Sequence, residues 1–132
     1  MINNIVHPGF VMMGFSLLIA LMPSKAKGGL SILGACCATA AGLTLSDSAR
    51  MTYAISKNFS IELMKVDDLT RAFLFAFCII SILIALYSYQ LTSKTEAGVA
   101  TFYAGCVMSV VLAGDCLSFL IFWELSAVAS SY

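Results

Sequence analysis

Residues 69–91 read LTRAFLFAFCIISILIALYSYQL and form the longest apolar stretch of the chain. Its single charged residue, Arg71, lies close to its start. An α-helix that spans a bilayer needs about 20 predominantly apolar residues, and this stretch supplies them. Tyr87 and Tyr89 near its other end are typical of the interface between membrane and water. The stretch therefore predicts a transmembrane helix.

The whole chain has the composition of a membrane protein. Of its 132 residues, 61% are hydrophobic and only 11% are charged. Its mean hydropathy of +0.97 is far above that of soluble domains. At about 20 residues per crossing, about four to five spans would use most of the chain and leave no separate soluble domain. Seven basic and seven acidic residues cancel, so we expect no nucleic-acid partner.

The expected fold is all-α, a polytopic bundle of transmembrane helices that forms one domain in a cell membrane. The apolar segments predict four full spans and an incomplete fifth, at about residues 5–22, 30–45, 69–91, 97–113 and 116–132. Pro23 ends the first segment, because proline cannot continue a helix comfortably. The second is rich in small residues such as Gly34, Ala35 and Cys36, so we expect it to pack in the bundle interior.

The aqueous loop between the second and third spans, residues 46–68, carries three basic and four acidic residues. Apolar and polar side chains alternate on both sides of Ser56-Lys57-Asn58, which is the period of a β-strand. We therefore predict a small surface hairpin with its turn at these three residues. Asp67 and Asp68 follow the hairpin, and we expect them to face solvent and to cap the third span.

The fifth segment, CLSFLIFWELSAVASSY from Cys116 to Tyr132, contains a carboxylate at Glu124. An acid at the centre of a membrane helix costs about 2.5–3.5 kcal/mol on insertion scales, so it is a candidate for an ion or proton path. A low dielectric destabilises the charged form of a carboxyl, which favours proton exchange. In the alternative structural role, Glu124 faces an aqueous crevice or bonds to hydroxyls of neighbouring helices. Asp115 suits the N-cap of this helix.

Other residues predict no cofactor, metal or hydrolytic site. The only histidine, His7, lies at the edge of the first span, where we expect it at the level of the lipid headgroups. No phosphate-binding glycine loop and no Ser/His/Asp arrangement is present. The cysteines have no CxxC spacing, and we interpret them as small packing residues. They are Cys36, Cys37, Cys78, Cys106 and Cys116.

Five short motifs give the chain a recognisable order of features. They are Val66-Asp67-Asp68-Leu69, Tyr87-Ser88-Tyr89, Ala113-Gly114-Asp115, Phe122-Trp123-Glu124-Leu125 and Ser131-Tyr132. This order resembles the N-terminal part of the antiporter-like membrane subunits shared by Mrp-type cation/proton antiporters and respiratory complex I. The resemblance covers residues 67–132 by motif and the first two spans by pattern, and the Phe-Trp-Glu-Leu stretch with the upstream aspartate is its most specific part.

The resemblance implies a role for Glu124 and a topology. Glu124 matches the fifth-helix glutamate that the family uses in proton transfer, opposite a lysine on a later helix. The family's topology places the N-terminus and the loop 46–68 outside, and Lys25, Lys27 and Lys94 inside. Charge bias alone does not orient the chain, because three basic residues lie on one side and four on the other.

The family's subunits have many more helices than this chain, including the helix with the partner lysine. We therefore expect the N-terminal part of a larger subunit: a fragment, a split-gene product or a truncated relic. The expected function is a membrane component of proton-coupled cation transport, an Mrp-type Na⁺/H⁺ antiporter subunit resembling the D type, with Glu124 as proton-relay carboxylate. Its expected partners are other integral membrane subunits, protons and Na⁺.

Two alternatives to this expectation stay open. One is a proton-translocating subunit of an NADH-quinone oxidoreductase or hydrogenase complex, so the sequence does not decide whether the chain belongs to an enzyme. The other is a non-transporting membrane scaffold or inactive fragment, in which helices pack through the small residues of the second and fourth spans and Glu124 is structural.

Overall fold

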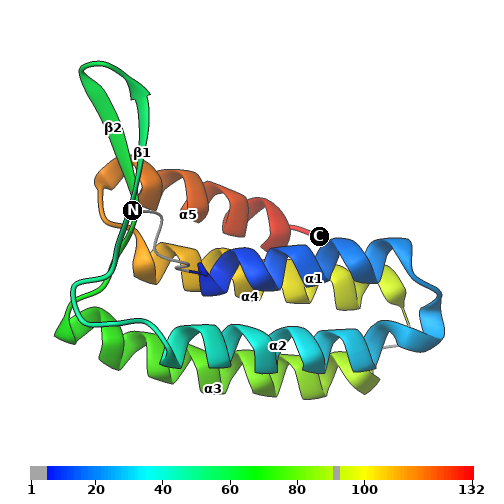
Figure 1. Cartoon of the computed structure of the whole chain (residues 1–132). Coiled ribbons are helices and arrows are strands. Elements are labelled where there is room, and N and C mark those ends of the chain that lie inside the picture. Colours follow the sequence, from blue (N-terminus) through cyan, green and yellow to red (C-terminus); the bar gives the residue numbers. More distant parts are fainter. Residues whose placement is uncertain (1–5, 91–92) are drawn as a thin grey trace.

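The computed structural model of the chain describes residues 6–90 and 93–132, which form a helical bundle with one β-hairpin (Figure 1). The elements are α1 (Pro8–Leu21), a 3-10 helix (Ser24–Ala26), α2 (Lys27–Leu43), β1 (Arg50–Ser56), β2 (Phe59–Lys65), α3 (Asp68–Gln90), α4 (Lys94–Leu112) and α5 (Cys116–Ser130). This order confirms a mainly helical fold with a hairpin between the second and third helices. The predicted span limits at Ile5 and Leu91 lie outside the described residues.

Three helical segments of the described chain are long and apolar enough to cross a membrane. They are the 20 residues Ser24–Leu43, the 23 residues of α3 and the 19 residues of α4. By contrast, α1 has 14 residues and α5 has 15, which at about 1.5 Å per residue gives roughly 21 and 22 Å against a hydrocarbon core of about 30 Å. The prediction of four full spans is therefore wrong.

The first predicted span is too short because prolines limit α1 at both ends. Pro8 occupies the first helical position, where the fixed φ of proline is favourable and its missing N–H costs nothing. At the other end, Met22 and Pro23 are both extended. The helix therefore has no room to lengthen in either direction without a change at one of these residues.

Two helix starts are fixed by polar side chains. The Asp67 carboxylate accepts a hydrogen bond from the Thr70 N–H at 2.8 Å, which satisfies a free amide at the start of α3 as predicted. Ser93 accepts from the Glu96 N–H at 3.4 Å and begins α4 three residues earlier than the apolar pattern suggests. The Ser-x-x-Glu spacing of these two residues is that of a capping box.

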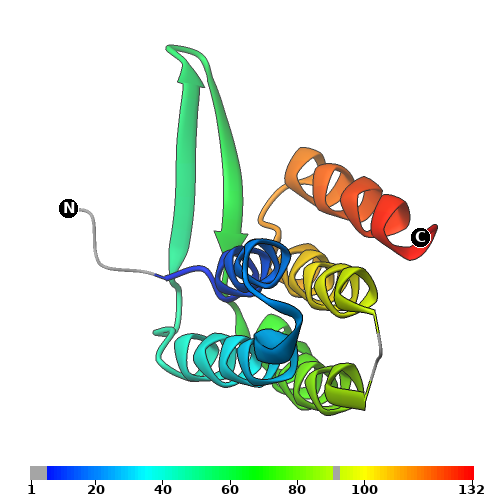
Figure 2. The ribbon, with the colours of Figure 1, turned by 90° about the vertical axis from the view of Figure 1, so that its right-hand side faces the viewer.

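The helices form layers, with α4 at the centre. Seen along the helices in Figure 2, α2 and α3 form one layer, α1 and α4 the next, and α5 lies on the outer side of α4. Helix α4 contacts α1, α2, α3 and α5. The prediction that the second span lies in the interior is only partly right, because α2 buries Ser31 and Ala35 but exposes Cys36 and Cys37.

Small and hydroxyl side chains bring α1 and α2 close to α4. A Cβ added to Gly9 would lie 2.7 Å from the Gly105 carbonyl oxygen, and one added to Gly105 would lie 2.8 Å from that of Gly9. The Ser31 and Thr101 hydroxyls are 3.0 Å apart and hydrogen-bonded. Close backbone approach of this kind is how membrane helices gain packing contacts.

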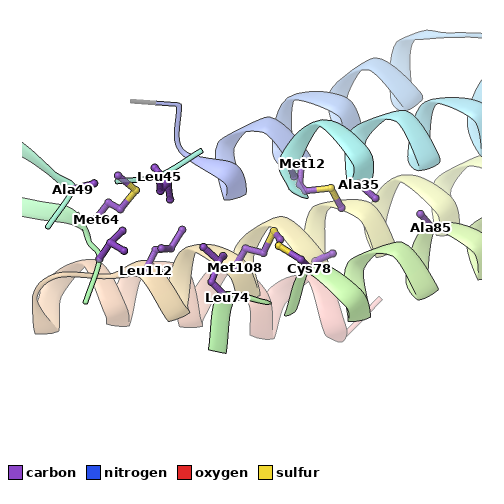
Figure 3. Close-up of a cluster of buried hydrophobic side chains, with 13 residues drawn as sticks. Met12, Ala35, Leu45, Ala49, Met64, Leu74, Cys78, Ala85, Met108 and Leu112 are labelled. Carbon is purple, nitrogen blue, oxygen red and sulfur yellow. The ribbon is translucent and has the colours of Figure 1, made fainter. Parts of the chain in front are cut away.

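Strands β1 and β2 pair antiparallel around the turn at Lys57-Asn58, which confirms the predicted hairpin. The hairpin is anchored by β2, from which Met64 inserts into the core beside Leu45 and Ala49 (Figure 3). Its remaining length projects across the end of the bundle, on the side where α5 lies (Figures 1 and 2). We call this the hairpin end of the molecule, and the opposite end the lysine end.

Candidate functional site

The start of α5 is built by Asp115. Its Oδ1 accepts a hydrogen bond from the Ser118 N–H at 2.6 Å, which confirms the predicted N-cap. Its Oδ2 accepts a second bond, also 2.6 Å, from the N–H of Glu62 in β2. The Gly114 N–H in turn donates to the Glu62 carbonyl oxygen at 3.0 Å. The loop before α5 and the hairpin therefore fix each other's position.

The two backbone donors also control the charge of Asp115. Hydrogen bonds from Ser118 and then Glu62 lower the pKa of its carboxyl below the usual value, because both favour the ionised form. Asp115 is therefore ionised near neutral pH, and both of its oxygens accept backbone hydrogen bonds. The sequence indicated the bond to Ser118, three residues away, but nothing in it indicated the bond to Glu62, 53 residues away.

Glu124 lies on the opposite side of α5 from the face that packs on the bundle. That packed face consists of Ser118, Phe122, Ser126 and Ala129. Glu124 is two residues from both Phe122 and Ser126, and two residues turn about 200° around a helix. Its side chain is therefore exposed, on the surface of α5 that no other described element covers (Figure 2).

The surface around Glu124 is apolar. The exposed hydrophobic side chains of α5 include Leu120, Ile121, Trp123, Leu125 and Val128. Within residues 6–90 and 93–132, the Glu124 carboxylate has no hydrogen-bond or ion-pair partner.

Nearby hydroxyls are already engaged with the backbone of α5. Ser126 donates to the Trp123 carbonyl oxygen at 2.7 Å, and Ser131 donates to that of Val128 at 2.7 Å. Ala127 and Ser131, three and seven residues after Glu124, are exposed on the same side of α5 as Glu124. No contact inside the described chain therefore gives this carboxylate a structural role.

Within residues 6–90 and 93–132, Glu124 is also the only charged residue in the middle of a helix. The other charged residues lie in loops, in the hairpin or in the first turns of helices, at one of the two ends of the bundle. Those at the hairpin end include two ion pairs, Arg71 with Asp47 at 2.6 Å and Arg50 with Glu62 at 3.4 Å. Position along the helix and lack of a partner thus distinguish Glu124 from every other acid.

The remaining candidates do not join this site. His7 is buried, 2% exposed, with its ring stacked on Phe10 at a centroid distance of 4.3 Å. Phe10 of α1 and Phe122 of α5 cover the ring, so His7 packs inside the protein, and its depth at the lipid headgroups stays a prediction. The described residues contain no group of three or more His, Cys, Asp or Glu that could hold a metal. Trp123 is exposed.

The cysteines are unpaired, and only Cys78 and Cys106 are buried, so the packing interpretation fits these two alone. The other three, Cys36, Cys37 and Cys116, are exposed.

Comparison with known protein families, with curated proteins and with solved structures gives no match to this chain.

Proposed function

We propose that this chain is a membrane component of proton-coupled cation transport, in which Glu124 takes up and releases the proton. The observation that carries the proposal is an unpartnered carboxylate at the ninth of the fifteen residues of α5, within an exposed apolar surface. In a membrane, an acid in such a place is expensive and is typical of a proton or ion path.

The same surface indicates that α5 contacts a partner outside the described residues. If α5 lay in lipid on this side, the ionised carboxylate would be in hydrocarbon without compensation. An adjoining helix with a basic side chain would remove that cost, and the motif around Phe122, Trp123 and Glu124 resembles the family in which a lysine supplies it. We therefore assign the exposed surface of α5 around Trp123 and Glu124 to contact with another membrane segment of the transporter.

The proposal is tested in membrane vesicles that contain the full chain together with its co-purifying subunits. Addition of Na⁺ to acidified vesicles should release protons, measured by recovery of a ΔpH-sensitive dye. Glu124→Gln should abolish this release, because an amide cannot carry the proton. The matched control is Glu96→Gln, an exposed acid in the first turn of α4, which should retain exchange. Unchanged exchange in Glu124→Gln would disprove the proposal.

The subunits that co-purify distinguish the two members of the superfamily. Small membrane subunits alone support an Mrp-type antiporter, whereas flavin- or iron–sulfur-containing subunits support a proton-translocating oxidoreductase or hydrogenase. The scaffold alternative predicts a third outcome, in which the chain folds but shows no proton exchange, with or without Glu124.

A further inference from the structure

Two grooves of similar size flank the contact between the last turn of α5 and α4, at the lysine end. The first has a volume of about 450 Å³ and is lined by α1, α4 and α5, with Lys94 at its rim. The second has a volume of about 440 Å³ and is lined by α3, α4 and α5, with Glu96 at its rim. Both share Val99, Ala129 and Tyr132. The two grooves therefore share part of their walls, and their lining residues include charges of opposite sign.

The Lys94 groove combines an apolar wall with an available cationic donor. Its lining includes Val99, Phe102 and Val128. The Lys94 ammonium donates to the carbonyl oxygens of Ala20 at 2.8 Å and Met22 at 3.2 Å, at the end of α1. An ammonium has three N–H donors, so one is left for an anion at the mouth of the groove.

The charge of the whole lysine end favours an anion there. Lys25, Lys27 and Lys94 lie at this end, against the single acid Glu96. The hairpin end, in contrast, carries four basic and five acidic residues. An apolar groove along α4, a candidate membrane span, with a basic residue in its lining matches an amphiphile that has an acyl chain and a negative headgroup.

We propose that the Lys94 groove binds one anionic phospholipid, with an acyl chain against Val99, Phe102 and Val128 and the phosphate on the Lys94 ammonium. The site does not depend on the proposed transport function. Because a lysine near a membrane surface contributes about 1 kcal/mol toward an anionic lipid, the groove should prefer phosphatidylglycerol over phosphatidylcholine about fivefold.

The test uses native mass spectrometry of the full chain in detergent, titrated with phosphatidylglycerol or with phosphatidylcholine of the same acyl chains. The native chain should retain one phosphatidylglycerol with about fivefold preference. Lys94→Gln should remove the preference, and Lys57→Gln, in the hairpin turn at the other end, should leave it unchanged. Equal retention of both lipids by the native chain would overturn the proposal.

A second variant separates lipid binding from folding, because Lys94 also holds the end of α1. Val128 is 69% exposed, so Val128→Phe fills the groove without disturbing the core and should abolish retention of phosphatidylglycerol. Undiminished retention in Val128→Phe would overturn the assignment to this groove. Inorganic phosphate at the same concentration should not displace the lipid. Displacement would show that the site binds only the phosphate group and that the apolar wall contributes nothing, which would overturn the proposal.

Discussion

Two carboxylates of the α5 region have opposite surroundings, and these determine what each contributes to stability. Asp115 accepts two short backbone hydrogen bonds that join α5 to β2. Glu124 has no partner within residues 6–90 and 93–132. Removing a group that satisfies buried or capping donors costs free energy, whereas removing an unpaired acid from an apolar surface does not. Mutations at the two positions should therefore change stability in different ways.

At Glu124 we expect that substitution does not destabilise the chain. Glu124→Gln should leave the melting temperature in detergent unchanged or slightly raised, because no interaction is lost and a charge is removed from an apolar surface. Asp115→Ala is the matched comparison and should cost about 1–2 kcal/mol through loss of the cap. Helical circular dichroism on heating measures both. A clear drop in the melting temperature of Glu124→Gln would support a structural role and count against proton exchange.

At Asp115 we expect an acid-sensitive contribution to stability. Its pKa in the folded chain is lowered by the Ser118 and Glu62 N–H groups, so the contribution is present above the unfolded pKa of about 3.9 and is lost as the pH falls through the folded pKa. Unfolding measured between pH 6 and 2 should therefore show falling stability below about pH 4. Asp115→Asn should flatten part of this fall, and Asp67, whose pKa Thr70 lowers, should account for another part. An identical pH profile in Asp115→Asn would contradict this account.

Among the elements, α4 determines how closely the other helices approach. The contact between Gly9 and Gly105 leaves no space for a side chain on either helix. Gly14, on the same helix as Gly9, has no neighbour within 4 Å of an added Cβ. The same substitution should therefore have opposite effects at Gly105 and Gly14, because one position is closely packed and the other is open.

Gly105→Ala should destabilise the bundle by about 1–3 kcal/mol, since the new methyl group meets the Gly9 carbonyl oxygen and backbone must move. Gly14→Ala should stabilise it by about 0.5–1 kcal/mol, because alanine loses less backbone freedom in a helix. Chemical unfolding in mixed micelles compares the two variants with the native chain. Equal effects of either sign would show that α1 and α4 are not in close contact.

The elements also show what the sequence could and could not reveal. The period-2 alternation around Lys57-Asn58 predicted the hairpin, and the apolar run predicted α3 within one residue at its start. The direction of the hairpin was not predictable, because it depends on the bonds of Glu62 to Gly114 and Asp115. The exposure of Glu124 was likewise not predictable. Apolar residues lie on every side of α5, so the sequence does not show which side packs on α4.

On the scale of the whole molecule, the helices run back and forth between two chemically distinct ends. The lysine end holds the connection between α1 and α2 and the start of α4, and the hairpin end holds both strands and the start of α5 (Figure 1). The helical segment Ser24–Leu43 and α3 are long enough to separate these ends by a bilayer. The short α1, which Met22 and Pro23 end, must then meet thinner hydrocarbon or neighbouring protein, since mismatch is relieved by local thinning or by association.

This arrangement predicts that Lys25 and Lys57 lie on opposite sides of the membrane, because Lys25 is at the start of the 20-residue segment Ser24–Leu43 and Lys57 follows its end. In a chain whose five cysteines are replaced by alanine, Lys57→Cys should react with an impermeant maleimide on intact cells, and Lys25→Cys only after permeabilisation. The parent chain without cysteine is the control and should not react. Labelling of both positions from one side would show that α2 does not cross. The reverse orientation would retain the crossing but contradict the topology that the family resemblance implies, in which the hairpin lies outside.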